Sequence, residues 1–168
     1  MRIAGLDLST ARIGYAAPEG GLHSFSARAK ADDVARRLYE LLTGLERLLR
    51  LYPPLPDLVA LEGYSLGSPG RLSLVRLGEL GGAVRLRLFE LDVAYVEIPP
   101  SSVKRHATGA GNADKHRMTA RAIELGARGS VNDDEADAFL LRRMARQAHG
   151  LERAELDHEQ DAIANLSW

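Results

Sequence analysis

Two acidic side chains lie in apolar surroundings where an ionised carboxylate is costly. Asp7 interrupts the apolar run 3–8, and Glu62 closes the apolar run 58–62. Burying an unpaired carboxylate costs several kcal/mol, which is on the scale of a whole domain's stability. Two ordinary arrangements stay open, an Asx turn in which Asp7 accepts from backbone donors near Ser9, and a strand end where Glu62 reaches water. Otherwise each carboxylate requires a cation.

A second pair of acids lies in the segment 132–138, which reads NDDEADA. Asp134 and Asp137 are three residues apart, so a helix places both side chains on one face. Apolar residues follow at 139–141, which puts Asp137 close to the buried side of that helix. Acids in a first helical turn commonly cap backbone donors and favour the positive end of the helix dipole, and we assign Asp133 to that role.

Together, two strand-end carboxylates and a helical pair have the composition of a site for two magnesium ions. Hard divalent cations prefer oxygen ligands, and two of them about 4 Å apart hold the attacking water and the leaving oxygen of a phosphodiester in line. Without metal, four clustered acids repel one another. We therefore expect Mg²⁺ or Mn²⁺ to stabilise the fold as well as to activate the protein.

The segments that must position these acids follow strand and helix patterns. Three short apolar runs joined by tight turns predict an antiparallel meander, at 2–8, 12–17 and 22–28. Two later runs predict strands whose connection by a helix favours parallel pairing, at 57–62 and 93–98. Apolar residues at three- and four-residue spacings predict four helices, at about 32–51, 72–91, 113–125 and 133–148. The order predicts a mixed five-stranded α/β sheet flanked by helices.

The chain length fits one domain. Of its 168 residues, 45% are apolar, which is enough to build a sizeable core. We expect residues 1–150 to form the catalytic unit and residues 151–168 to add a last helix or a loose tail to the same domain. Pro99 and Pro100 are interpreted as a break after the last strand, with no helix before about residue 113.

Composition limits the compartment and the partners. There is no cysteine, which excludes disulfides and thiolate zinc sites and fits a reducing compartment. The start of the chain lacks the apolar stretch of a signal peptide, and no run approaches the roughly 20 apolar residues of a membrane span. We expect a cytoplasmic protein without a membrane partner, in a cell or in the host cell of a virus. The formal net charge is −1, so a nucleic-acid partner would have to be met by a local basic patch.

Such a patch is present in the segment 101–128. It holds six basic residues against only Asp114 and Glu124, and it contains two of the chain's three lysines. The basic residues are Lys104, Arg105, Lys115, Arg117, Arg121 and Arg128. An ordinary solvated helix face would explain some of them, but the neighbouring acidic segment favours a nucleic-acid contact.

Several segments resemble the RuvC family of Holliday junction resolvases, in the order in which that family has them. The opening GLDLSTARIGYA resembles the family's first strand, turn and second strand, and LVALEGY resembles the strand that ends in a glutamate. GELGGAVRLRL is similar to a glycine-bearing helix, VEIPPSSVKRHATGAGNADKHRM to the stretch with two lysines, and DDEADAFLL to the closing acidic helix. The resemblance covers about residues 2–145 and implies a ribonuclease H-like fold.

The resemblance also implies roles for individual residues. It implies that the metal-binding and catalytic acids are Asp7, Glu62, Asp134 and Asp137, with Lys115 beside them in catalysis. It implies two Mg²⁺ ions for each active site and no organic cofactor. DNA contacts are expected from the basic segment and from an aromatic side chain that follows the glutamate, namely Lys104, Arg105, Lys115, Arg117, Arg121 and Tyr64. Asp134 is variable in the family, and Tyr64 follows the glutamate at a shorter spacing than in bacterial relatives.

The implied activity is resolution of four-way DNA junctions by two symmetric, metal-dependent phosphodiester hydrolyses. A nearly two-fold symmetric substrate that is cut on two strands is matched by a homodimer. The candidate dimer surface is a set of leucines and glycines on the second helix, Leu74, Leu77, Gly78, Gly81 and Gly82. Packing of the same residues on their own sheet is the alternative.

Three other classes share parts of this pattern. Sugar-kinase or actin-type ATPases also begin with a strand, an aspartate and a small polar turn, but they need two such domains and a longer chain. A nucleic-acid-binding module that has lost catalysis would not need all four acids. A YqgF-like RNA-processing nuclease or a ribonuclease H would use the same acids and a similar basic segment, and it is the leading alternative.

Overall fold

The computed structural model describes residues 1–64 and 71–166. Its elements, in chain order, are β1 (Ile3–Leu8), β2 (Arg12–Ala16), β3 (Leu22–Ser26), α1 (Val34–Leu49), β4 (Leu58–Glu62), α2 (Arg71–Glu90), β5 (Ala94–Ile98), α3 (Pro100–Thr108), α4 (Lys115–Glu124), α5 (Asp133–Ala148) and α6 (Asp157–Ala164). None of the helices in these two ranges has both the length and the apolar run that a membrane span requires.

The strands form one mixed sheet in the order β3-β2-β1-β4-β5. β1 pairs antiparallel with β2, and β2 pairs antiparallel with β3. β1 also pairs parallel with β4, and β4 pairs parallel with β5. The predicted fold class, an antiparallel meander followed by parallel strands, is therefore confirmed.

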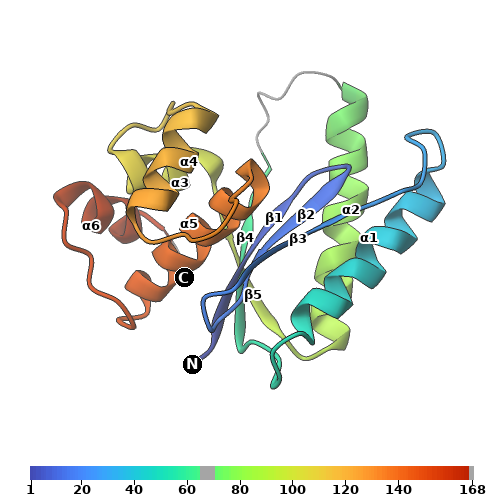
Figure 1. Cartoon of the computed structure of the whole chain (residues 1–168), viewed down its shortest axis with the longest axis horizontal. Coiled ribbons are helices and arrows are strands. Elements are labelled where there is room, and N and C mark those ends of the chain that lie inside the picture. The colour runs from blue at the N-terminus through green and yellow to red at the C-terminus, as the bar shows by residue number, and fades with distance from the viewer. Residues whose placement is uncertain (65–70, 167–168) are drawn as a thin grey trace.

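Helices cover both faces of this sheet (Figure 1). α1 and α2 lie on one face, and α3, α4, α5 and α6 lie on the other. Each face has its own apolar core, because successive strand residues point to opposite sides. Leu6, Ile13 and Tyr15 face the first pair of helices, whereas Ile3 and Ile98 face the second group. The sheet is thus a rigid, two-sided platform whose strand ends can hold functional groups.

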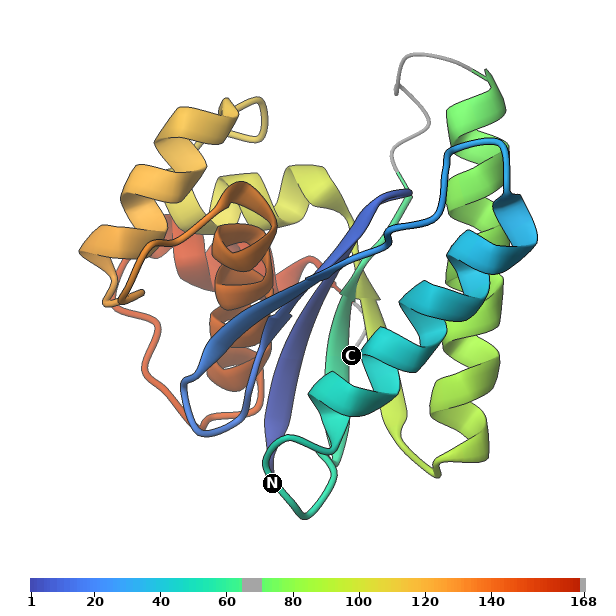
Figure 2. The same ribbon diagram turned by 45° about the vertical axis from the view of Figure 1, so that its right-hand side comes forward.

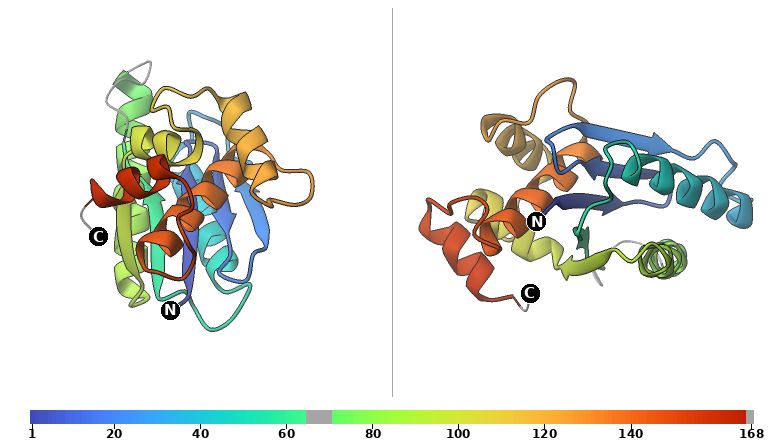
Figure 3. Two further views of the ribbon diagram at one scale, coloured as in Figure 1. Left: turned by 90° about the vertical axis from the view of Figure 1, so that its left-hand side faces the viewer. Right: turned by 90° about the horizontal axis from the view of Figure 1, so that it is seen from below.

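Two strand glycines bring α5 unusually close to the sheet. α5 crosses β1 and β2 (Figures 2 and 3). A Cβ atom at Gly5 would overlap the carbonyl oxygen of Ala138, and a Cβ atom at Gly14 would overlap the carbonyl oxygen of Asp134. Only glycine lets the helix backbone rest directly on the strands. The first turn of α5 is thereby fixed over the end of β1.

The prediction of no helix between residues 98 and 113 was wrong. Pro100 is the first residue of α3, a position where its missing N–H and its fixed φ suit a helix. The Pro99-Pro100 pair therefore ends β5 and also starts a helix, which closes at Gly109 with a left-handed φ of 78°. Of the two alternatives for the C-terminal segment, the structure has a helix, α6, which packs against α3 and α5.

Candidate active site

Asp7 and Glu62 lie side by side at one end of the sheet. Leu6 in β1 is paired with Leu61 in β4, and the two strands are parallel, so the next residues along, Asp7 and Glu62, are neighbours. Asp7 is only 6% exposed although it carries a carboxyl group. The Ser9 N–H donates to the Arg12 carbonyl at 2.9 Å and not to Asp7. Glu62 is partly buried and contacts the Asp7 carboxyl group, so it does not simply extend into water.

α5 adds two further acids to this end of the sheet. The helix begins after Asn132, whose side chain accepts from the Glu135 backbone N–H at 3.0 Å, while the Glu135 carboxylate accepts from the Asn132 N–H at 3.3 Å. This capping box satisfies backbone N–H groups at the start of the helix without Asp134 or Asp137. Neither acid is therefore needed to cap the helix.

The four acids are electrostatically coupled. Burial raises the pKa of Asp7 well above its ordinary value of 3.8, and the charges of Glu62, then Asp137, then Asp134 raise it further. Burial also raises the pKa of Glu62, although its hydrogen bond with Asp7 and the charges of Lys104 and Lys115 act in the opposite direction. Burial and the charge of Glu62 raise the pKa of Asp137 to about 7. Acids from three distant segments thus meet in one place, where they share a need for positive charge.

Their chemistry fits hard divalent cations, since carboxylate oxygens are the ligands that Mg²⁺ and Mn²⁺ prefer. In the described part of the chain, however, no three His, Cys, Asp or Glu side chains are already arranged as a ligand set. Without metal, the side chains have other partners. Asp7 and Glu62 contact each other, and Asp134 pairs with Arg12 at 3.1 Å. Metal binding would require these side chains to leave those partners, a change of rotamers on a fixed backbone.

Arg12, Gly5 and Gly14 belong to this site, yet the sequence reasoning did not single them out. Arg12 in β2 supplies the positive charge beside Asp134. The two glycines let α5 approach. A signal for the glycines existed, because a glycine inside a strand often marks a close backbone approach. Nothing comparable distinguishes Arg12 from the chain's many other arginines.

Lys104 and Lys115 lie on the same side of the sheet as the acids. Lys104 comes from α3, Lys115 begins α4, and both positive charges lower the pKa of Glu62. The Lys115 Nζ lies 3.8 Å from Asp133, and its side chain is 74% exposed. Lys115 also lowers the pKa of Asp137. Lys115 therefore combines access to solvent with a position beside the acids.

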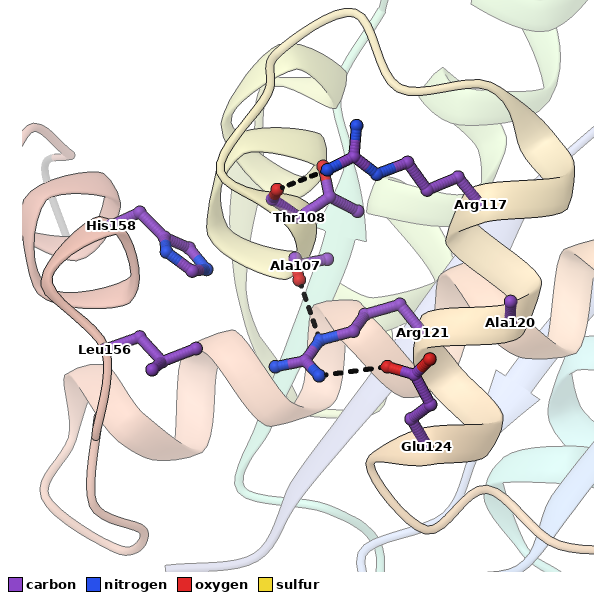
Figure 4. A pocket seen from close by; sticks show the side chains of 8 residues that line it. All are labelled: Ala107, Thr108, Arg117, Ala120, Arg121, Glu124, Leu156 and His158. Atoms are coloured by element: carbon purple, nitrogen blue, oxygen red, sulfur yellow. Dashed lines mark hydrogen bonds and ion pairs between the residues drawn. The ribbon is translucent and has the colours of Figure 1, made fainter.

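Among the other arginines that are predicted to contact DNA, Arg117 and Arg121 already donate hydrogen bonds within the protein (Figure 4). Arg121 donates through Nε to the Ala107 carbonyl at 3.0 Å and through Nη1 to Glu124 at 3.1 Å. Arg117 donates to the Thr108 carbonyl at 3.0 Å, and it is exposed. Both arginines thus satisfy carbonyl groups at the C-terminus of α3. Arg105 is exposed on α3.

Tyr64 is packed against α2 and does not project into solvent. Its hydroxyl accepts from Arg85 at 2.8 Å, and the Arg85 guanidinium lies 5.0 Å from the ring centroid. Gly81 provides the space, since a Cβ atom there would overlap the tyrosine hydroxyl. A DNA contact by Tyr64 would require the ring to leave this position.

The five residues expected at a dimer surface differ in their exposure on α2. Leu77 packs on the core between the sheet and α1, and Gly81 is buried under Tyr64. Leu74 is partly buried, whereas Gly78 and Gly82 open onto free space. The outward side instead carries four strongly exposed apolar residues, Leu72, Val75, Leu86 and Phe89.

We expect the metal-free protein to lose stability as the pH rises from about 4 to about 7. The folded-state pKa of Asp137 is about 7, above its ordinary value of 3.8. Between these values the unfolded chain releases the proton and the folded chain retains it, so a rising pH favours unfolding. Urea unfolding at pH 5 and pH 7.5 with a chelator measures the effect. Added Mg²⁺ should restore stability at pH 7.5. Asp137→Asn should flatten the dependence of the unfolding free energy on pH. If this variant had the same pH dependence as the wild type, the assignment would be contradicted.

The fold and the acid cluster define a protein of the ribonuclease H-like class. A model of the family described as "Crossover junction endodeoxyribonuclease RuvC" matches residues 5–141. The crossover junction endodeoxyribonuclease RuvC of Caldanaerobacter subterraneus subsp. tengcongensis is 30% identical over 125 residues, which cover 70% of this chain and 74% of that protein. The chain belongs to the RuvC family.

Two solved structures are similar in fold. The Thermus thermophilus RuvC structure has a TM-score of 0.67 and 24% sequence identity, and the match covers 89% of this chain and 96% of the other. T. thermophilus RuvC in complex with a Holliday junction substrate has the same TM-score with 20% identity, over 83% and 89% of the two chains. These likenesses support the RuvC-type arrangement of the sheet and its helices.

Proposed function

We propose that this protein is a structure-selective endonuclease that resolves four-way DNA junctions in the cytoplasm by two symmetric phosphodiester hydrolyses. Membership of the RuvC family supports this function, as does the similarity in fold to a RuvC that was solved with a Holliday junction. One observation carries the proposal. The carboxyl groups of Asp7, Glu62 and Asp137, which come from β1, β4 and α5, lie together beside Lys115, close enough for their charges to act on one another's pKa values.

We infer that Asp7, Glu62, Asp134 and Asp137 hold two Mg²⁺ ions, with Mn²⁺ as a substitute. When bound, such a pair of ions supplies charge for the attacking water and for the leaving oxygen. The chain's own contribution is placement. β1 and β4 hold two acids in adjacent rows, and α5 holds the others over them. Without a metal ion, the Arg12 guanidinium pairs with the Asp134 carboxylate.

Lys104 and Lys115 have a separate task in this proposal, which is to hold the DNA backbone against the acids. A phosphate carries a negative charge into a cluster of negative charges, and the two lysines offset that repulsion. Exposed Arg105 and Arg117 extend the positive surface along α3 and α4. Arg121 and Tyr64 contribute only if they leave their present contacts.

Lys115→Ala is expected to weaken junction binding by about three- to tenfold and to reduce the slope of log affinity against log salt by about one. The reason is that one phosphate contact is lost and one fewer counterion is released. Fluorescence anisotropy over a salt series measures both effects. Lys30→Ala is the matched control, because Lys30 is the one lysine outside the basic segment. An unchanged slope for Lys115→Ala would remove this lysine from the DNA surface.

We further propose that the protein acts as a homodimer through the outward side of α2. Positions 72, 75, 79, 82, 86 and 89 recur at alternating three- and four-residue spacings, which form one stripe along a helix. Four of them are large apolar residues with exposures of 57–79%, and Gly82 lies in the middle with nothing near it. A second copy related by a two-fold axis would bury the same stripe and place two active sites on one junction.

Leu86→Glu is expected to convert the dimer into a monomer and to replace paired cuts by single nicks. A buried unpaired carboxylate at a helix contact costs several kcal/mol, which exceeds what a small interface tolerates. Sedimentation velocity measures the mass. Ile123→Glu is the control, since Ile123 on α4 is similarly exposed at 54% but lies away from α2. A Leu86→Glu protein that stays dimeric would exclude this surface.

The substrate assignment is tested by offering three labelled nucleic acids with Mg²⁺ and with a chelator. We expect paired, symmetric nicks in a four-way junction, and no comparable cutting of a linear duplex or an RNA–DNA hybrid. Preferred cutting of the hybrid would favour the ribonuclease H alternative. Junction binding without cutting at any metal concentration would favour a module that has lost catalysis.

A further inference from the structure

Arg142 is a buried cation without a carboxylate partner. It lies in the second half of α5 and is only 9% exposed. Its Nη1 donates to the Ala17 carbonyl, and its Nε has no hydrogen-bond partner among the described residues. Burial, followed by the neighbouring charge of Arg146, lowers the pKa of Arg142 below its ordinary value, although the charges of Glu152 and Glu19 act in the opposite direction. The guanidinium also lies 5.4 Å from the centroid of the Phe139 ring. A buried guanidinium is normally compensated by an anion, and none of the described carboxylates lies within ion-pair distance of this one.

The charges around Arg142 are already used by other pairs. Four arginines, counting Arg142, meet three glutamates, so the positive charges exceed the negative charges by one. The surrounding pairs are Arg2 with Glu19, Arg143 with Glu152, Arg143 with Glu159, and Arg146 with Glu152. Among the described residues, Arg142 is the arginine of this group that holds no ion pair. An added anion would therefore find a guanidinium that no carboxylate already occupies.

A cavity of about 310 Å³ opens beside Arg142. Its walls come from the turn after β2, the residues that follow α4, and the second half of α5 with the segment after it. Pro18, Leu125 and Phe139 form an apolar part. Three arginines and two glutamates form a charged part with an excess of one positive charge, namely Arg142, Arg143, Arg146, Glu19 and Glu152. Arg142 and Arg146 are four residues apart on one helix, so their guanidinium groups lie on the same side. Two guanidinium groups on one wall suit an oxyanion that has several acceptor oxygens.

This cavity is separate from the acid cluster. Arg142 follows Asp134 by eight residues on the same helix, a distance of about 12 Å along the axis. Arg12, at one end of β2, lies beside Asp134, whereas Ala17, beyond the other end, lies beside Arg142. A ligand here would leave the acids accessible to DNA.

We propose that the cavity beside Arg142 and Arg146 is a binding site for a small phosphate-type oxyanion, either free phosphate or the phosphate group of a small ester. Arg142 supplies a guanidinium that holds no ion pair among the described residues, and Arg146 supplies donors from the next turn of the helix. Phosphate is favoured over a carboxylate because it offers more acceptor oxygens to diverging guanidinium groups.

Thermal unfolding and calorimetric titration of the full chain with inorganic phosphate test the proposal, with sodium chloride at matched ionic strength as the reference. We expect saturable binding in about the millimolar range, a phosphate-dependent rise in melting temperature, and weaker binding of acetate. Arg142→Met should abolish the binding. Arg146→Gln should weaken phosphate binding by at least about tenfold. This second variant tests the site even if the Arg142 variant does not fold.

Two control variants locate the site. Arg153→Gln removes an exposed arginine that does not line the cavity, and Lys115→Ala removes the lysine beside the acids. Both should bind phosphate as the wild type does. The proposal would be overturned by non-saturable heats, by acetate binding more tightly than phosphate, by unchanged affinity in Arg146→Gln, or by loss of binding in Lys115→Ala instead.

Discussion

Asp7→Asn is expected to reduce junction cleavage by at least about three orders of magnitude while junction affinity stays within about threefold of the wild type. Asp7 is the most buried of the four acids and lies between Glu62 and the α5 acids, so its loss removes a ligand shared by the whole site. The basic surface on α3 and α4 is untouched. Single-turnover cleavage and a binding titration in Ca²⁺ measure the two effects separately.

The same variant should be more stable than the wild type when no metal is present. Because the folded-state pKa of Asp7 is raised, ionisation of this group at neutral pH opposes folding, and asparagine removes that cost. We expect the metal-free melting temperature to rise by about 2–4 °C. Asp133→Asn is the matched control, since Asp133 is an exposed acid in the first turn of α5, near the site, and should keep activity within about tenfold. Normal cutting by Asp7→Asn would refute the assignment of the active site.

Gly14→Ala is expected to lower cleavage by at least about 100-fold and to destabilise the protein by about 2–4 kcal/mol. The added methyl group would overlap the backbone carbonyl of Asp134, and β2 is held in place by its pairing with β1 on one side and with β3 on the other. The first turn of α5 must therefore shift, and Asp134 and Asp137 shift with it. Urea unfolding and cleavage kinetics measure the two losses.

Gly78→Ala provides the control for this substitution, because Gly78 lies outside the proposed dimer stripe. Gly78 lies in the interior of α2, and no described atom comes within 4 Å of a Cβ atom there, so alanine should stabilise the helix by up to about 1 kcal/mol and leave cleavage unchanged. If Gly14→Ala were as active and as stable as Gly78→Ala, the close contact of α5 with β2 would not be what places the acids.

The fold could be predicted from the sequence because its pattern is consistent at every level. Apolar runs, turns and helical spacings identified the five strands and four of the six helices that the structure describes within residues 1–64 and 71–166. α3 was missed because the proline pair was interpreted only as a break, whereas Pro100 occupies the one helical position that favours it. Tertiary packing rather than local sequence decides that α6 forms, since Glu159, His106 and Gln147 are buried together between α3, α5 and α6.

The acids of the site could be proposed from the sequence, but their surroundings could not. An aspartate inside an apolar strand is locally anomalous, and Asp7 is therefore visible without a structure. Arg12 is not anomalous, because an arginine beside a turn is ordinary, and its pairing with Asp134 spans 122 positions. The same limit applies to α2, where helical spacing alone could not separate the side facing the sheet from the outward stripe.

The central claim is that acids from β1, β4 and α5 hold divalent ions between them. Anomalous diffraction from crystals grown with Mn²⁺ tests it directly, because the scattering peaks report the metal positions without reference to activity. We predict two peaks about 4 Å apart, bounded by the carboxylates of Asp7, Glu62, Asp134 and Asp137, and their loss in Asp7→Asn crystals. Full Mn²⁺ occupancy elsewhere on the molecule, with none between Asp7 and Glu62, would contradict the account.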